Sequence, residues 1–155
     1  PAKAGWQVFC NRGTSGIDGS TSTAIGASVV QSIPTLLITG DLSFFYNSNA
    51  LWCNYIPKNL KIIVVNNAGG GIFRILPTDK GTPFFETFQE TTHSLTAKHL
   101  CAMYGFTYLC AQNQEELTKT LETFFSQYES PMLLEVFTPR TLNNTILKDY
   151  FNVLS

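Results

Sequence analysis

The sequence has few charged residues and no cluster of one sign. Among its 155 residues, 14% are Asp, Glu, Lys or Arg, and the formal net charge is -1. Nucleic-acid-binding domains carry a basic patch, and runs of Lys and Arg mark proteins that contact anionic membrane surfaces. Because the sequence contains neither feature, we expect a protein that binds neither nucleic acid nor membranes.

Long apolar runs and paired cysteines are also absent from the sequence. No run approaches the roughly 20 apolar residues that span a bilayer, and the first residues do not resemble the apolar region of a secretory signal. The four cysteines show no CxxC spacing; they are Cys10, Cys53, Cys101 and Cys110. These absences favour a soluble protein in a reduced, cytoplasmic setting.

The residues that are present fit one compact α/β domain. With 44% hydrophobic residues, a chain of 155 residues can bury a sizeable core. Short runs rich in Val, Ile and Leu are typical of buried parallel strands. We predict five strands, within residues 6–10, 35–39, 60–66, 107–111 and 132–137.

Segments with helical period separate these runs. The clearest is 113–130, where Asn113 and Glu116 form a start that resembles a capping box. The apolar residues that follow have the spacing of a helix that covers a sheet; they are Leu117, Leu121, Phe124, Phe125 and Tyr128. Further helices are predicted within 18–32, 47–55 and 94–105.

Strands that alternate with helices predict a three-layer fold, in which a parallel sheet carries helices on both faces. Ligands bind such sheets beyond the carboxyl ends of the strands. The loops there are 11–19, 40–43 and 66–93, and the last is far longer than an ordinary connection. We expect a loop of that length to be functional or disordered.

Two oxygen-bearing side chains follow neighbouring predicted strands. Asp41 comes after Gly40 at the end of the second run, and Asn67 ends the third. Together with a loop carbonyl, these oxygens suit a hard cation such as Mg²⁺, which takes its other ligands from water and phosphate. The metal turns repulsion between a carboxylate and a diphosphate into a bridge, and the helix start after Asp41 would offer N–H groups to the anion. The pattern therefore predicts a metal and diphosphate site.

The spacing from Asp41 to the Asn pair resembles the thiamine diphosphate (ThDP) motif of decarboxylases and related transferases. The stretches "NRGTSGIDGSTSTAIG" and "VVNNAGGGIFRILPT" resemble the 2-succinyl-5-enolpyruvyl-6-hydroxy-3-cyclohexene-1-carboxylate synthase family (the MenD family) of menaquinone biosynthesis. The resemblance covers essentially the whole chain but only the C-terminal, diphosphate-binding third of such an enzyme. It implies the ThDP-binding fold called the PP domain, with residues 1–155 as a fragment of a longer enzyme.

The resemblance assigns roles to individual residues. Asp41, the Asn67 side chain and the Gly69 carbonyl would hold Mg²⁺ or Mn²⁺. The residues matched to the cofactor are Ser15, Gly16, Ile17, Gly40, Asp41, Leu42, Ser43 and Asn67. Among them, Ile17 is the catalytic assignment, because it would prop ThDP in its V conformation. The residues matched to the substrate are Arg12, which would contact a carboxylate, and Ile72, Phe73 and Leu76.

The implied reaction decarboxylates 2-oxoglutarate and adds the succinyl semialdehyde equivalent to isochorismate. In this family the glutamate that activates ThDP comes from the N-terminal pyrimidine-binding domain of a neighbouring subunit. The resemblance therefore implies a homodimer or homotetramer in full-length form. We expect the 155-residue chain alone to be inactive.

Several residues also have simpler interpretations. Arg12 is compatible with a surface ion pair, and the apolar site residues are compatible with core positions. His93 and His99 are interpreted as structural or solvated, because no nucleophile or orienting carboxylate lies near them in the sequence. Two residues depart from the family pattern, Ala68 where some members have a third Asn, and Arg74 where a smaller polar residue occurs.

Two other functions remain open. Another ThDP decarboxylase, such as a relative of acetolactate synthase, shares the Asp and Asn motif but should lack "RGTSGIDG". From another class, a non-catalytic phosphate-binding module of flavodoxin-like shape has the same alternation of elements. That alternative lacks the GxGxxG or GxxxxGK loop that would support it.

Overall fold

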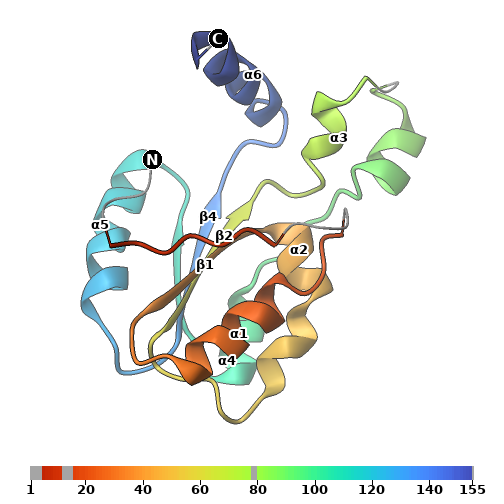
Figure 1. Cartoon of the computed structure of the whole chain (residues 1–155). Helices are drawn as coiled ribbons and strands as arrows, with labels where there is room; N and C mark the ends of the chain where they lie inside the picture. The colour runs from red at the N-terminus through yellow and green to blue at the C-terminus, as the bar shows by residue number, and fades with distance from the viewer. Residues whose placement is uncertain (1–4, 12–15, 78–79, 155) are drawn as a thin grey trace.

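The computed structural model shows an α/β fold built on one parallel sheet (Figure 1), and it describes residues 5–11, 16–77 and 80–154. The strands are β1 (Thr35–Gly40), β2 (Leu60–Asn66), β3 (Thr107–Ala111) and β4 (Met132–Phe137). They are hydrogen-bonded in the order β1-β2-β4-β3, and each pair is parallel. Four of the five predicted strands are therefore confirmed.

One face of the sheet is covered by four helices. They are α1 (Ser20–Val30), α2 (Asp41–Tyr46), the 3₁₀ helix η1 (Ser48–Trp52) and α4 (Lys98–Tyr104). Ile62 and Val64 point from β2 into this layer, where Phe44 of α2 and Leu51 of η1 are also buried. The predicted helix within 18–32 is confirmed as α1.

The opposite face is covered by α5 (Gln114–Ser126), which confirms the three-layer arrangement. Its start is capped as predicted, because Glu116 N donates to Asn113 Oδ1 at 2.9 Å. The Glu116 carboxylate in turn accepts a hydrogen bond from Gln112 N at 2.8 Å. Phe124 is fully buried against Met132 and Leu134 of β4.

The predicted strand within residues 6–10 is wrong. These residues form no strand, and all of them are exposed, Phe9 to 83%. A buried strand needs a neighbouring strand and a layer that covers its apolar face. β1 forms one edge of the sheet, and its Ile38 is itself 64% exposed. The apolar composition of residues 6–10 shows that they could be buried. It does not show whether this chain supplies a layer that covers them.

Three predicted helices have different bounds in the structure. The helix predicted for 113–130 ends at Ser126, so Tyr128 lies beyond it. Within the range 47–55 the structure has the shorter 3₁₀ helix η1, which is separated from the end of α2 by the buried Asn47. Asn47 Oδ1 accepts a hydrogen bond from Ser22 N of α1 at 3.0 Å, so this residue ties α1 to the break between the two helices. α4 begins at Lys98 rather than at Ser94. Residues 91–96 are not helical, and Thr96 Oγ1 and Ala97 N donate hydrogen bonds to Glu135 of β4.

The connection from β2 to α4 is not a bare loop in its described part. It contains α3 (Ile72–Ile75) and the π-helical turn η2 (Phe85–Gln89), and Phe85 and Glu90 are fully buried. A further helix that was not predicted, α6 (Asn143–Leu154), contacts α3 and extends away from the sheet (Figure 1). Among the helices of residues 5–11, 16–77 and 80–154, none has the length and apolar character to cross a membrane.

Candidate functional site

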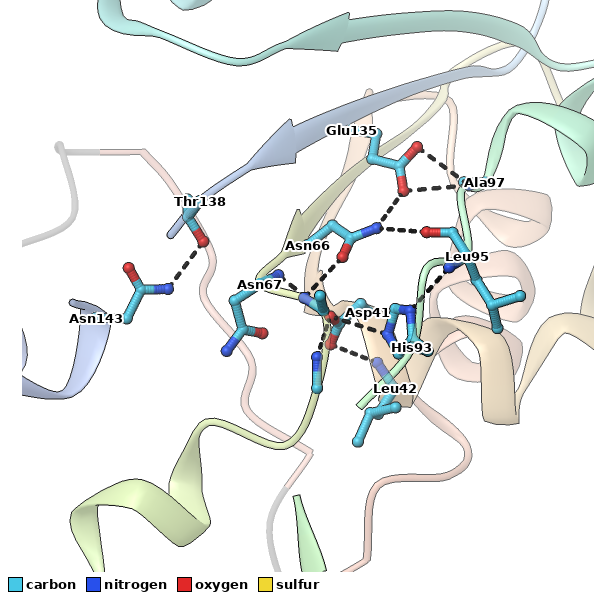
Figure 2. Close-up of polar contacts among 12 residues, drawn as sticks. Asp41, Leu42, Asn66, Asn67, His93, Leu95, Ala97, Glu135, Thr138 and Asn143 are labelled. Atoms are coloured by element: carbon cyan, nitrogen blue, oxygen red, sulfur yellow. Dashed lines mark hydrogen bonds and ion pairs between the residues drawn. The ribbon is translucent and has the colours of Figure 1, made fainter. Parts of the chain in front are cut away.

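The carboxyl ends of β1 and β2 bring Asp41 and Asn67 together, as the sequence predicted. The strands pair in register up to Gly40 and Val65, so the residues that follow each strand lie side by side. Asp41 Oδ2 accepts hydrogen bonds from Asn67 N at 3.1 Å and Gly69 N at 3.0 Å (Figure 2). The side chain of Asp41 is 3% exposed, and these backbone donors hold its carboxylate in place.

Glycine is required in the turn after β2 for steric reasons. Gly69 has a φ of +155°, and a Cβ atom there would lie 3.0 Å from the Glu90 carbonyl oxygen. At Gly71 a Cβ atom would lie 2.7 Å from Nδ2 of Asn67. The turn is further fixed by Asn66 Oδ1, which accepts a hydrogen bond from Ala68 N at 3.0 Å. The glycines therefore leave room for the Asn67 side chain and for the segment that carries Glu90.

His93 lies against Asp41 and is largely buried, so of the two interpretations from the sequence it is structural and not solvated. His93 Nε2 is 3.2 Å from Asp41 Oδ2, and the imidazole is 10% exposed. Its Nδ1 accepts a hydrogen bond from Leu95 N at 3.0 Å, and its ring packs edge-on against Phe45. One feature of the sequence pointed to this position: His93 ends the long segment that begins at the carboxyl edge of the sheet.

A buried carboxylate next to the site was also missed. Glu135 of β4 is fully buried and accepts hydrogen bonds from Asn66 Nδ2, Thr96 Oγ1 and Tyr108 Oη, each at 2.7 Å, and from Ala97 N at 3.1 Å. Burial raises the pKa of Tyr108, and the Glu135 carboxylate adds to this effect. Burial, followed by the same carboxylate, raises the pKa of Cys101 to about 12. A Glu inside the apolar run "MLLEVF" was the available signal.

The residues predicted to hold the cofactor gather partly at the same edge. Ser43 Oγ donates a hydrogen bond to the Ile17 carbonyl, which joins the loop before α1 to the start of α2. Gly16, Ile17 and Gly40 are exposed beside this contact. Leu42 N is not free for an anion, because it donates to Asp41 Oδ1 at 2.7 Å, and α2 has only six residues. Arg12 and Ser15 lie outside the described residues.

The residues predicted to contact the substrate lie on α3 and at its end. Ile72 is 58% exposed and Leu76 is 43% exposed. Ile17, in the loop before α1, is 49% exposed, so the interpretation of these three residues as core is wrong. Phe73 is half-buried, with its ring against Gly70. Ile72 and Leu76 thus expose apolar side chains just after the turn that carries Asn67 and Gly69.

An ion-pair cluster fixes the segment after α3. Glu90 is fully buried, and its carboxylate is paired with the guanidinium groups of Arg74 and Arg140. The distance from Arg140 Nη1 to Glu90 Oε2 is 2.9 Å. The hydrogen bond to Glu90 raises the pKa of Arg74. Because Arg140 follows β4, the cluster ties α3 and η2 to the same end of the sheet as Asp41.

The donor set fits a hard divalent cation better than a soft one. Within the described ranges, no group of three or more His, Cys, Asp and Glu side chains is arranged to hold a metal. The oxygens at the strand ends are one carboxylate, the Asn67 amide and backbone carbonyls of a glycine turn. A site with so few protein ligands suits Mg²⁺, which retains waters and takes phosphate oxygens. The room that Gly71 leaves for the Asn67 amide agrees with such a role.

Comparison with known families and sequences agrees with this geometry. Residues 3–136 match the family described as "Thiamine pyrophosphate enzyme, C-terminal TPP binding domain". The chain is 57% identical over 148 residues to the 2-succinyl-5-enolpyruvyl-6-hydroxy-3-cyclohexene-1-carboxylate synthase of Christiangramia forsetii, covering 96% of this chain and 26% of that protein. The synthase of Porphyromonas gingivalis is 48% identical over 147 residues, with 95% and 26% covered. The chain thus spans about a quarter of the length of the curated relatives it matches.

A solved structure has the same fold. The thiamine diphosphate-dependent 4-hydroxybenzoylformate decarboxylase of Rhodococcus jostii superposes with a TM-score of 0.59 and 27% sequence identity. The match covers 75% of this chain and 22% of that protein. The fold predicted from the sequence, a parallel sheet between two helical layers of the ThDP-binding type, is confirmed.

Proposed function

Because the chain belongs to the family of C-terminal TPP-binding domains of thiamine pyrophosphate enzymes, we propose that it anchors the cofactor diphosphate through Mg²⁺ or Mn²⁺. Asp41, the Asn67 amide and the Gly69 carbonyl would hold the metal. The observation that carries this proposal is the buried Asp41 carboxylate, held by Asn67 N and Gly69 N where two parallel strands end. When bound, ThDP supplies the electron sink for decarboxylation.

The chain's own residues would orient the cofactor and shape one wall of the substrate site. Ile17 projects from the loop whose carbonyl accepts the Ser43 hydrogen bond, so its apolar side chain is available to support the cofactor. Ile72 and Leu76 expose apolar surface beside the metal turn, which would exclude water from the reacting atoms. Arg12 and Ser15 are proposed from the sequence alone, Arg12 for a substrate carboxylate and Ser15 for the cofactor.

We propose that the whole enzyme is a 2-succinyl-5-enolpyruvyl-6-hydroxy-3-cyclohexene-1-carboxylate synthase of menaquinone biosynthesis. It would act in the cytoplasm on 2-oxoglutarate and isochorismate, and the support is the 57% identity to synthases of that name. The activating glutamate would come from the N-terminal pyrimidine-binding domain of a neighbouring subunit in a homodimer or homotetramer. On this proposal residues 1–155 alone are inactive, and activity returns when that domain is supplied.

A calorimetric titration tests the diphosphate anchor. In the full-length protein, ThDP would be titrated in the presence of Mg²⁺ or of EDTA, using wild type, Asp41→Ala and the exposed Asp149→Ala as a control. We expect Mg²⁺-dependent ThDP binding in wild type and in Asp149→Ala. Asp41→Ala should lose it, because the diphosphate then faces no metal-binding carboxylate. Unchanged ThDP affinity in Asp41→Ala would overturn the proposal.

The likeness to a ThDP-dependent decarboxylase of known structure favours one second candidate, another decarboxylase of this superfamily. Product analysis separates the two, because the synthase requires both 2-oxoglutarate and isochorismate, whereas a simple decarboxylase releases an aldehyde from one 2-oxo acid.

Arg12→Lys tests the proposed contact of Arg12 with a substrate carboxylate, since Lys does not reproduce the bidentate contact of Arg with a carboxylate. We expect weaker use of substrate with unchanged ThDP binding. The flavodoxin-like module is not proposed further, because the chain matches a TPP-binding family.

A further inference from the structure

We propose that His93 is a positioning residue that fixes the Asp41 carboxylate for the divalent cation. The inference rests on the proposed function, because it concerns the metal ligand Asp41. His93 lies 52 residues after Asp41 in the chain, yet its Nε2 is 3.2 Å from Asp41 Oδ2 (Figure 2). Nε2 is buried, and no hydrogen bond of ordinary geometry to it is recorded among the described residues; Asp41 Oδ2 is the oxygen recorded beside it, at 3.2 Å.

The hydrogen bond on the other side of the ring identifies the tautomer. Leu95 N donates to His93 Nδ1 at 3.0 Å, so Nδ1 carries a lone pair and no proton. In a neutral imidazole the proton then resides on Nε2, which faces Asp41 Oδ2. His93 therefore offers Asp41 a neutral N–H group. A cationic neighbour would compete with the metal for the carboxylate, whereas a neutral donor orients the carboxylate without adding a positive charge.

The contacts of the two carboxylate oxygens differ in number. Oδ2 accepts hydrogen bonds from Asn67 N and Gly69 N, which occupy its two lone pairs, and His93 Nε2 lies 3.2 Å from the same oxygen. Oδ1 accepts one hydrogen bond, from Leu42 N at 2.7 Å. Oδ1 is thus the oxygen with remaining capacity for a metal. His93 adds a third N–H neighbour on the side of Oδ2 and would thereby keep Oδ1 turned toward the metal.

The backbone holds His93 in this position from several sides. His93 N donates to the Ala68 carbonyl at 3.3 Å, which joins it to the metal turn. Asn66 Nδ2 donates to the Leu95 carbonyl at 3.0 Å, and Glu135 accepts from Ala97 N at 3.1 Å. The imidazole therefore sits on a segment that is fixed to both β2 and β4. Groups that orient a metal ligand in this way affect metal affinity about 10- to 100-fold when they are removed.

Three variants of the full-length protein test this assignment. His93→Phe keeps a ring against Phe45 but removes the N–H donor. His93→Gln places an amide N–H near the position of Nε2. His99→Phe changes an exposed histidine on α4 and serves as the matched control. Mn²⁺ binding would be measured by electron paramagnetic resonance at saturating ThDP, and the melting temperature of each protein would be measured without metal and cofactor.

We expect His93→Phe to weaken Mn²⁺ binding about 10- to 100-fold with a melting temperature close to wild type. His93→Gln should recover most of the affinity, and His99→Phe should bind as wild type does. Wild-type affinity in His93→Phe would overturn the inference. So would an equal loss in His93→Phe and His93→Gln, because an N–H group near the position of Nε2 would then not restore Mn²⁺ binding.

Asp41→Ala separates this inference from the proposed function. If Asp41→Ala loses Mn²⁺ while His93→Phe retains it, the metal site stands and only the role of His93 is refuted. If Asp41→Ala binds Mn²⁺ as wild type does, Asp41 is not a metal ligand. The proposed diphosphate anchor and the inference drawn from it are then both refuted.

Discussion

The sheet buries two ionisable side chains in very different ways. Glu135 of β4 faces the layer that contains α4. Its carboxylate accepts hydrogen bonds from Thr96 and Ala97, in the segment after His93, and from Tyr108 of β3. Lys61 of β2 lies on the opposite face under α5, where its Nζ donates to the carbonyls of Phe124 and Gln127, the latter at 2.6 Å. Neither is paired with an opposite charge in the described chain.

The difference teaches which buried charge is connected to the site. Lys61 caps the last turn of α5 and faces the rings of Phe124 and Tyr128, with Nζ 4.3 Å from the Tyr128 centroid. It fastens one helix to the sheet at the end away from Asp41. Glu135 holds Asn66 and the residues after His93, which shape the metal turn. Removing Lys61 should therefore affect stability alone, whereas removing Glu135 should affect stability and metal binding.

The largest effect is expected for Glu135→Ala. Its removal leaves the Tyr108 hydroxyl, Ala97 N and one Asn66 N–H without their acceptor, which should lower the free energy of unfolding by about 3 kcal/mol. Urea denaturation of the full-length protein measures this, and Mn²⁺ binding with ThDP should weaken as well. Glu135→Gln, which keeps one acceptor oxygen, should lose less. Unchanged metal binding in a folded Glu135→Ala protein would contradict the link between this residue and the site.

Lys61→Ala should have the next largest effect on stability. Its removal leaves carbonyl groups at the end of α5 without a donor and opens space beside the Phe124 ring, so the free energy of unfolding should fall by about 2 kcal/mol. Lys61→Met is the matched variant, because it retains most of the side-chain volume without the charge. Both variants should bind ThDP and Mn²⁺ as wild type does. Weaker metal binding in Lys61→Met would remove the contrast with Glu135.

Gly71→Ala tests the site directly, through the position of the Asn67 amide. Gly71 has an ordinary backbone conformation, with φ of -55°, so the added Cβ acts only through its approach to Asn67 Nδ2. We expect the Asn67 amide to shift, Mn²⁺ affinity to fall about tenfold, and stability to change by about 1 kcal/mol or less. Gly26→Ala in α1 is the control, because a Cβ there meets no atom within 4 Å. Equal metal affinity in both variants would contradict the role of Asn67.

The smallest expected effect is a difference in alkaline stability between the two sites. Burial lowers the pKa of Lys61 below 10.5, so between that lowered pKa and 10.5 the unfolded state binds more protons and stability rises with pH. Burial raises the pKa of Tyr108 above 10.0, so its contribution is complete below 10.0 and is lost as pH rises further. Urea unfolding would be measured across this pH range for wild type, Lys61→Met and Tyr108→Phe. The stability difference between wild type and Lys61→Met should rise with pH, and the difference between wild type and Tyr108→Phe should fall. Slopes of the same sign would contradict the comparison.

The sequence alone determined the parallel sheet and the location of the site. Runs of Val, Ile and Leu between segments of helical period predicted four strands correctly, because the period of side chains along an element is a local property. Residues that follow adjacent parallel strands must lie at one edge. The proximity of Asp41 and Asn67 therefore followed from their positions in the sequence.

Only the tertiary structure decided which distant residues complete the site. Residues 6–10 have the composition of a buried strand, but burial requires a covering layer that no local pattern specifies. Neither spacing nor periodicity linked His93 to Asp41, since the segment between them folds through α2, η1, β2, α3 and η2. Glu135 stood out as a charge within an apolar strand, yet its partners come from three other parts of the chain. Local composition sets which residues tolerate burial, whereas the path of the connections sets which of them meet.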